Sequence, residues 1–265
     1  MALDPLYLAT AVEAALVAAR IQKRFFRQNP DIRKKGRIDL VTAADLEVER
    51  TFRALVADRF PSHAVLGEEA TGPNDVAADC RWIIDPLDGT TNFAHGLAFF
   101  CVSIALEVRG TIELGVVYDP IGEELFTAER GSGARLNGVP LRVSPTTSLV
   151  DALVVTGFHH SVWEDPGPQV AVFAAFLREA QAVRRLGSAA LDLCYVAAGR
   201  FDGYWESKIH PWDIAAGSLV VQEAGGTVSG TDGSPFDVFG GHVLASNGHI
   251  HKVMLDIIDR AVQRT

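Results

Sequence analysis

The chain has no uninterrupted apolar run long enough to cross a bilayer, which argues against a membrane-spanning protein. Its start lacks the basic residues of a secretory signal, because Asp4 and Glu13 interrupt the apolar pattern there. These two absences lead us to expect a cytoplasmic protein without a membrane partner.

Cysteine is scarce, and Cys80, Cys101 and Cys194 are odd in number and far apart. Such a distribution is typical of small buried thiols in a reducing compartment and predicts neither a disulfide nor a zinc site. Two familiar catalytic motifs are also missing. There is no Gly-x-Ser-x-Gly sequence, and Gly131-Ser132-Gly133 lacks the lysine of a P-loop, so a hairpin explains these glycines better.

Basic residues are outnumbered, since 24 Lys and Arg face 33 Asp and Glu for a formal net charge of −9. This excess of acid argues against nucleic acid as a partner. Hydrophobic residues make up 48% of the 265 positions, which is enough for a substantial core. We predict a single domain over residues 1–265, with halves at about 1–146 and 147–265 where the pattern changes.

The first half combines two helices with strands at hairpin distances. Apolar side chains recur at helical spacing from Pro5 to Phe26, and Thr42 with Asp45 predicts a capping box for a helix that Pro61 ends. Residues 33–37, between these helices, are predicted to form a loop. Turn signals between the later runs indicate an antiparallel sheet. The expected strands are 64–66, 81–84, 99–108, 112–118 and 124–128.

Strands and helices alternate in the second half, which predicts a layered α/β arrangement. Ser188 is expected to cap a helix through Ala198, and Asn247 to cap the last helix. A helix that begins near Pro211 is expected to end at Gly225-Gly226, as glycine commonly follows a helix. The other expected elements are strands 153–156, 201–206 and 242–245, a short strand ending at 186, and a helix over 169–181.

The most informative segment follows Trp82, where an apolar strand ends in two carboxylates, Asp85 and Asp88. Gly89 and two threonines come directly after them. Carboxylates at the end of a buried strand need hydrogen bonds, an ion pair or a bound cation. Because Mg²⁺ prefers a few carboxylate oxygens together with oxygens of the substrate, the segment favours a divalent metal that faces a phosphate.

Two further segments place acids at the end of an element. Glu68 and Glu69 follow a short apolar strand, and Asp213 lies in the first turn of an apolar helix. Each alone has a plain structural explanation, a solvated turn for the glutamates and compensation of the helix dipole for Asp213. Three acidic ends in one chain weaken that explanation, since α/β proteins gather their sites at strand ends.

Together these segments resemble the inositol monophosphatase family. The first family signature is similar to residues 85–93 (Asp-Pro-Leu-Asp-Gly-Thr-Thr-Asn-Phe), and the second is similar to residues 212–217 (Trp-Asp-Ile-Ala-Ala-Gly) and 223–226. Residues 39–45, 67–69 and 187–193 match as well. The resemblance therefore covers nearly the whole chain in the order of the family.

The resemblance implies an α+β fold, a layered α-β-α-β-α sandwich, in a lithium-sensitive sugar-phosphate phosphatase that is commonly a homodimer. The implied cofactor is Mg²⁺, with about two or three ions in each site. The implied reaction is direct in-line attack of metal-activated water on a phosphate monoester such as inositol 1-phosphate or a related sugar monophosphate.

Carried over position by position, the resemblance also assigns roles to residues. The metal ligands would be the side chains of Glu68, Asp85, Asp88 and Asp213 and the backbone carbonyl of Leu87. The catalytic residues would be Glu68, Thr90 and Asp45, with Thr90 and Asp45 together orienting the attacking water. Glu69 and Lys34 would support the ligands from outside. For Lys34, a solvated charge in a flexible loop is an equally open interpretation.

The substrate contacts implied by the resemblance lie on two sides of the phosphate. They are Asp88, Gly89, Thr90, Gly187, Ser188, Ala189, Glu206 and Asp213. The amides of Gly89 and Thr90 would receive a phosphate oxygen. Glu206 can accept hydrogen bonds from two neighbouring hydroxyls, which favours a polyol, although an acid that merely ends a strand is the alternative.

Several functions stay open within this resemblance. Fructose 1,6-bisphosphate is the main rival substrate, because some microbial relatives accept both esters. Histidinol phosphate is a weaker rival, since that branch differs more in residues 187–193. A regulatory role in binding transcription machinery, in addition to catalysis, belongs to a different class of function.

Overall fold

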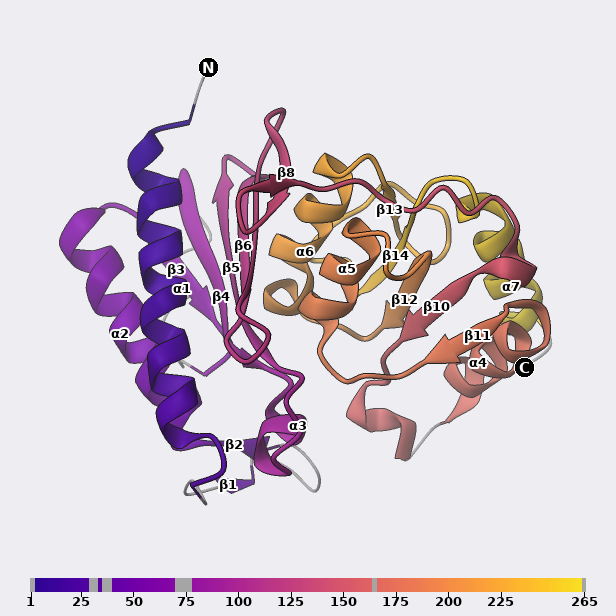
Figure 1. The fold of residues 1–265 in the computed structure, drawn as a ribbon, viewed down its shortest axis with the longest axis horizontal. Helices are drawn as coiled ribbons and strands as arrows, with labels where there is room; N and C mark the ends of the chain where they lie inside the picture. Colours follow the sequence, from indigo (N-terminus) through magenta and orange to yellow (C-terminus); the bar gives the residue numbers. More distant parts are fainter. Residues whose placement is uncertain (1–2, 29–32, 35–39, 70–77, 164–165, 264–265) are drawn as a thin grey trace.

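The computed structural model describes residues 3–28, 33–34, 40–69, 78–163 and 166–263, and Figure 1 shows them arranged in layers. Helices α1 and α2 cover one face of a seven-stranded sheet, α5 and α6 lie between this sheet and a five-stranded one, and α4 and α7 cover the outer face. This confirms the predicted α-β-α-β-α sandwich. The helices are α1 (Pro5–Phe25), α2 (Ala43–Arg59), α3 (Thr90–Ala94), α4 (Gly167–Glu179), α5 (Ala189–Ala197), α6 (Pro211–Glu223) and α7 (His251–Val262).

The seven-stranded sheet is antiparallel except at one edge, where β3 pairs with β4 in parallel. The expectation of an antiparallel first half is therefore wrong for this pair. The strands follow chain order across the sheet, β3 (Ala64–Gly67), β4 (Cys80–Asp88), β5 (Cys101–Val108), β6 (Thr111–Asp119), β7 (Glu124–Glu129), β8 (Gly133–Leu136) and β9 (Val139–Pro140). As predicted, the glycines at 131–133 form the hairpin between β7 and β8.

The five-stranded sheet mixes parallel and antiparallel pairs. Its order is β11 (Ala182–Arg184), β10 (Leu153–Thr156), β12 (Gly203–Ser207), β14 (His242–Ser246) and β13 (Thr227–Ser229). A separate pair joins β1 (Arg33–Lys34) to β2 (Leu40–Val41). The expectation of a loop over residues 33–37 is therefore wrong for Arg33 and Lys34. The middle core contains residues from both sides of position 146, so the two predicted halves share one core. The division at about residue 146 stays a prediction.

Three hydrophobic cores hold the layers together. Small side chains of α1, including Ala11 and Ala15, are buried in one core with Trp82 of β4. The middle core contains the buried residues of α5 and α6 and the inner faces of both sheets. On the outer face, Phe176 of α4 stacks on Trp205 of β12 with ring centroids 3.9 Å apart. The chain thus has enough apolar burial on both sheets to fix the strand ends where the acids lie.

Strand β4 continues past the point where the sequence predicts its end. The expected strand stops at residue 84, but the structure extends it through Pro86 to Asp88. The register against β5 shifts between Asp85 and Asp88, and such an irregularity accommodates a proline that cannot donate to the ladder. Gln22 of α1 donates to the Pro86 carbonyl at 2.8 Å. Both aspartates are consequently held on a strand and not on a loose turn.

Two predicted helix caps differ in the structure. Asn247 is not the cap of α7, which begins at His251; its side chain instead accepts from the amides of His249 and Ile250 in a turn before the helix. Ser188 does occupy the N-cap position of α5, but its hydroxyl makes no capping hydrogen bond. The Thr42 and Asp45 capping box is confirmed.

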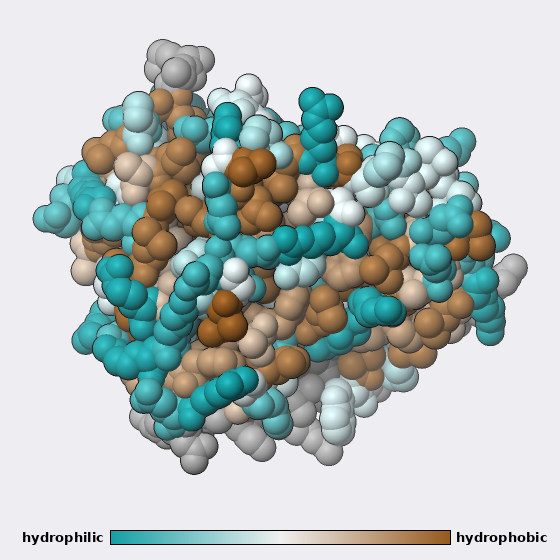
Figure 2. Space-filling model, in the orientation of Figure 1, coloured by the Kyte–Doolittle hydropathy of each residue, from teal (hydrophilic) through white to brown (hydrophobic). Residues whose placement is uncertain are grey.

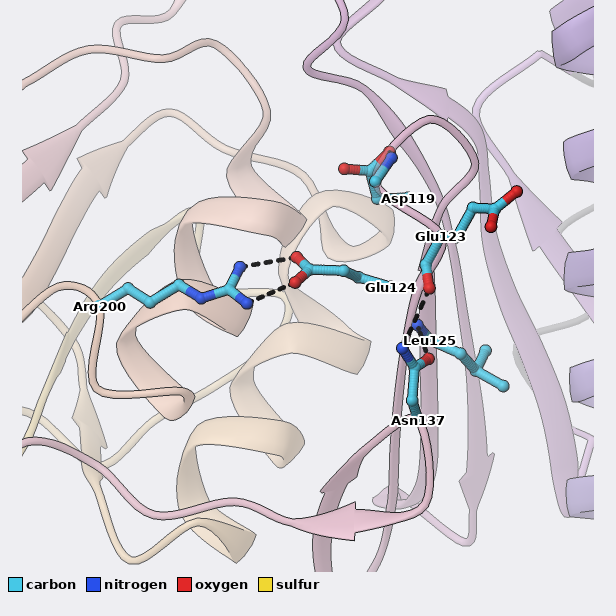
Figure 3. Close-up of polar contacts among 7 residues, drawn as sticks. Asp119, Glu123, Glu124, Leu125, Asn137 and Arg200 are labelled. Atoms are coloured by element: carbon cyan, nitrogen blue, oxygen red, sulfur yellow. Dashed lines mark hydrogen bonds and ion pairs between the residues drawn. The ribbon is translucent and has the colours of Figure 1, made fainter.

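An ion pair links the first sheet to the helix layer behind it. Figure 3 shows both guanidinium nitrogens of Arg200, just after α5, directed at the carboxylate of Glu124 on β7. The Arg200 guanidinium also lies over the Tyr195 ring, 4.5 Å from its centroid. This two-point contact is geometrically specific, and it joins segments 76 residues apart in sequence.

The surface in Figure 2 carries hydrophilic side chains over most of the visible face, with hydrophobic residues interspersed. Among the described residues, no helix is both long enough and apolar enough to cross a membrane. Cys80, Cys101 and Cys194 are all free thiols. Cys101 and Cys194 are buried, as expected, whereas Cys80 is only partly buried, so the expectation is wrong for it.

Candidate active site

A cavity of about 230 Å³ brings together residues from both sheets. It is lined at the ends of β3, β4 and β12 and at the starts of α3, α5 and α6. The predicted site residues that line it are Glu68, Asp85, Leu87, Asp88, Gly89, Thr90, Gly187, Ser188, Ala189, Glu206 and Asp213. Side chains separated by up to 145 residues (213 − 68) thus face one space.

The metal-ligand candidates form an acidic cluster. Burial, followed by the charges of Glu68, Asp88 and Asp213, raises the pKa of Asp85 well above its ordinary range. Burial also raises the pKa of Asp88 to about 6, and burial together with Asp88 raises that of Asp213. Carboxylates that raise one another's pKa this way are stabilised in their charged form by a cation. The donor set, all hard oxygen, therefore fits a divalent metal.

Asp88 is the best anchored of these acids. Its Oδ2 accepts from the Ser188 hydroxyl and from the Ala190 amide, each at 2.7 Å, and its Oδ1 accepts from the Ala189 amide at 3.3 Å. The Ser188 hydroxyl thus donates to a carboxylate 100 residues away and does not cap its own helix. These contacts fix β4 against the start of α5.

Asp213 serves as both an intrahelical cap and a cavity residue. Its Oδ2 accepts from the His210 amide at 2.8 Å, which makes it the third-position acid of a capping box on α6. The structural interpretation of this residue and the metal-binding one are therefore compatible. A helix start that fixes the carboxylate also orients it toward the other acids.

Thr90 and Asp45, predicted to orient the attacking water, lie near each other but are not tightly bonded. The Thr90 hydroxyl is 3.4 Å from Asp45 Oδ1 and 2.9 Å from the Leu87 carbonyl. One hydroxyl proton can serve only one of these acceptors well, and the shorter contact is to Leu87. The Leu87 carbonyl has a second lone pair, so its predicted ligand role is compatible with this bond.

A second group of acids adjoins the first. Three carboxylate oxygens lie within 4.8 Å of one another, one each from Asp45, Glu68 and Glu69. Burial raises the pKa of Asp45 to about 6, with Thr42 opposing. The Glu69 amide donates to Glu49, a residue that the sequence analysis missed. The sequence could have indicated Glu49 through Arg53, which lies four positions along α2. The Arg53 Nε donates to Glu49 Oε1 at 2.8 Å and fixes the glutamate side chain.

A second wall of the cavity carries a further acid. Glu206 projects from β12, and its Oε2 accepts from the Tyr204 hydroxyl at 2.7 Å. Burial raises the pKa of Glu206 to about 7. Lys34, predicted to support the ligands, belongs to β1, where it pairs with Leu40; its side chain lies outside the described part of the structure.

A family model described as the inositol monophosphatase family matches residues 4–263. The chain belongs to this family. An inositol-1-monophosphatase of Synechocystis sp. is 45% identical over 93% of this chain and 86% of its own length. A Pasteurella multocida protein named Nus factor SuhB is 42% identical over 94% of each. A solved structure of inositol monophosphatase from Anabaena (Nostoc) sp. superposes with a TM-score of 0.88, at 41% identity over 96% of each chain.

Membership of the inositol monophosphatase family confirms the predicted class of enzyme, a metal-dependent phosphatase. The cavity of this family member also contains residues to which the sequence analysis gave no role, among them Gly157, Arg185, Asp192, Lys208 and His210. One of them has a clear backbone signal, since Lys208 is held at φ 61°, a conformation that few residues other than glycine adopt.

Gly157 controls the position of Glu206. A Cβ at residue 157 would lie 1.9 Å from Glu206 Oε2, so the carboxylate occupies space that any side chain there would need. We expect Gly157→Ala to displace the carboxylate. The KM for inositol 1-phosphate should then rise about tenfold, because the substrate loses one or two hydrogen bonds to Glu206. Phosphate-release kinetics measure this effect. An unchanged KM with a normal melting temperature would show that Glu206 does not contact the substrate.

Proposed function

We propose that the chain is a Mg²⁺-dependent phosphomonoester hydrolase that acts on inositol 1-phosphate or a related sugar monophosphate. The observation that carries this proposal is the convergence of Glu68, Asp85, Asp88 and Asp213 on one cavity in a member of the inositol monophosphatase family. Of the three relatives reported above, one is named inositol-1-monophosphatase and one inositol monophosphatase, and none is named for fructose bisphosphate or histidinol phosphate.

The metal would be held by the four carboxylates and by the Leu87 carbonyl. Mg²⁺ suits these hard oxygen donors, which supports it over softer ions. When bound, it supplies an acidified water at neutral pH and neutralises charge that develops on the phosphate and the leaving oxygen.

The chain's own residues then have to position the reactants, because phosphoryl transfer requires little covalent chemistry from the protein. Thr90 and Asp45 would orient the attacking water, and the amides of Gly89 and Thr90 would bind a phosphate oxygen. Gly89 stands at φ 96°, a conformation that lets its backbone approach a ligand closely.

The other wall of the cavity would recognise the alcohol part of the ester. Gly187, Ser188 and Ala189 lie at the start of α5, and Glu206 faces the same space. A carboxylate that already accepts from Tyr204 through Oε2 can accept from sugar hydroxyls through its remaining lone pairs. This arrangement favours a polyol ester over an aromatic one.

A phosphate-release panel tests the proposal. We expect rapid hydrolysis of inositol 1-phosphate with Mg²⁺, slower hydrolysis of fructose 1,6-bisphosphate and histidinol phosphate, and a fall of about a hundredfold or more in EDTA, since metal catalysis contributes several kcal/mol. Li⁺ is expected to inhibit. Hydrolysis that persists at full rate without a divalent metal would overturn the proposal.

The resemblance to the family further supports a homodimer, which is also the commonest oligomer of soluble proteins. Light scattering on the purified chain would test it, with one protomer at 28.5 kDa as the reference. The cytoplasmic location predicted from the sequence remains a prediction.

A further inference from the structure

Asp192 is a buried acid that the proposed mechanism does not use. It lies in the first turn of α5 and is 1% exposed, yet its side chain forms part of the cavity wall. Its Oδ1 atom is buried and has no hydrogen-bond partner among the residues that the structure describes. Its backbone amide donates to the Ser188 carbonyl at 3.0 Å, so the helix holds the residue in place.

A buried carboxyl oxygen without a partner is destabilising, and proteins retain such atoms mainly where a ligand completes them. Burial, followed by the charges of Asp88 and Glu206, raises the pKa of Asp192 well above its ordinary range, while Arg185 opposes this effect. Asp202, ten residues along the chain (202 − 192), provides a contrast. It is 7% exposed, and its two oxygens accept from the Ser144 hydroxyl and the Leu153 amide.

We propose that Asp192 binds a hydroxyl of the polyol part of the substrate, beside the hydroxyls that Glu206 holds; this inference rests on the proposed function. A hydroxyl both donates and accepts, and a carboxyl can accept from it or, when protonated, donate to it. The terminal torsion of aspartate is broad, so a small rotation turns an oxygen toward the cavity. Two carboxyl groups on one wall then select neighbouring hydroxyls and disfavour an alcohol without them.

Three residues face this carboxyl and define the competing explanations. Asp88 is a proposed metal ligand, so Asp192 could instead bind the metal. Arg185, on the same wall, could instead be its permanent partner, which would make Asp192 structural. Glu206 is the neighbour that the proposal requires, since both side chains line the same cavity.

The test compares two esters, inositol 1-phosphate and 4-nitrophenyl phosphate, which has no hydroxyl on its alcohol part. We expect Asp192→Ala to raise the KM for inositol 1-phosphate about tenfold, because the substrate loses one hydrogen bond. The KM for 4-nitrophenyl phosphate is expected to stay within about twofold, since that ester never makes the contact. Asp192→Asn keeps a donor and an acceptor, so it should recover part of the loss.

The matched control is Asp202→Asn, which removes a fully bonded buried aspartate outside the cavity. It should lower the melting temperature and leave both KM values unchanged, whereas Asp192→Asn should not lower the melting temperature. Equal changes in KM for both esters, or a shift in the Mg²⁺ concentration for half-maximal rate, would overturn the proposal. Calorimetric titration with inositol 1-phosphate separates the role of Asp192 from the proposed function, because it measures binding without turnover. If the wild type binds this ester but does not hydrolyse it, and Asp192→Ala binds it more weakly, the proposed function alone would be overturned.

Discussion

Asp88→Asn is expected to lower Mg²⁺-dependent turnover of inositol 1-phosphate about a thousandfold, because the loss of one ligand charge removes roughly 4 kcal/mol of transition-state stabilisation. Asp88 belongs to the acidic cluster, and its charge raises the pKa of both Asp85 and Asp213. Its replacement therefore changes the field at both of these proposed ligands. Steady-state phosphate release over a range of Mg²⁺ concentrations measures the loss.

The fold is expected to survive this substitution, although with some loss of stability. An asparagine oxygen can still accept from Ser188 and Ala190, but its amide group would face the Ala189 amide, now 3.3 Å from Oδ1. We expect a cost of about 1–2 kcal/mol in the free energy of unfolding.

Asp119→Asn is the matched control for this loss of stability. Asp119 is another buried aspartate at a strand end, drawn in Figure 3, and it accepts from the Ile121 and Gly122 amides of the turn after β6. It lies outside the cavity, so its variant should lose stability and keep its activity. Turnover of Asp88→Asn within tenfold of wild type would rule out Asp88 as a metal ligand.

Much of the fold was predictable because its signals are local. The Thr42 and Asp45 capping box spans four residues, and the strand at 153–156 is an apolar run with clear ends. The sequence analysis missed β1, β2, β9 and β13, because strands of two or three residues carry no periodicity of their own. Their pairing depends on neighbours that the local sequence does not specify.

Most of the residues that line the cavity were predictable, but their contacts were not. The family resemblance indicated which acids converge, since it carries tertiary information that periodicity lacks. It did not indicate that the Ser188 hydroxyl donates to Asp88, or that Gly157 leaves space for Glu206. Both contacts join segments at least 49 residues apart (206 − 157). Ser188 and Asp88 meet where the start of α5 packs on β4, and Gly157 and Glu206 meet at the ends of the paired strands β10 and β12, so neither contact can be read from local sequence. Local propensity placed Ser188 as a helix cap, and the buried carboxylate competed successfully for its hydroxyl.

Mg²⁺ is expected to stabilise the folded protein strongly, and more so at higher pH. At a metal concentration a hundredfold above its Kd, binding to the native state adds about 2.7 kcal/mol. For a chain of this size that corresponds to a rise in melting temperature of roughly 5–10 °C. Thermal unfolding followed by circular dichroism, in EDTA and in Mg²⁺, measures the difference.

The pH dependence follows from acids whose pKa is higher in the folded state than in the unfolded chain. Burial raises the pKa of Asp88 to about 6 and that of Glu206 to about 7, and it raises that of Asp85 as well. Between about pH 4 and 7 the native state therefore binds more protons than the unfolded state, so the metal-free protein loses stability as the pH rises. Mg²⁺ competes with these protons, and its stabilising effect should be smaller at pH 5 than at pH 8.

Two variants separate this pH-dependent stabilisation by Mg²⁺ from general ion binding to the protein surface. Asp119→Asn should retain the full difference between pH 5 and pH 8, because its carboxylate lies outside the cluster. Asp88→Asn should lose most of it, since one of the converging charges is gone. A Mg²⁺ shift that is equal at both pH values, or undiminished in Asp88→Asn, would mean that the ion does not bind among the buried carboxylates. The charge repulsion within the cluster would then have to be relieved by protons alone, and the enzyme could not keep its acids ionised at neutral pH.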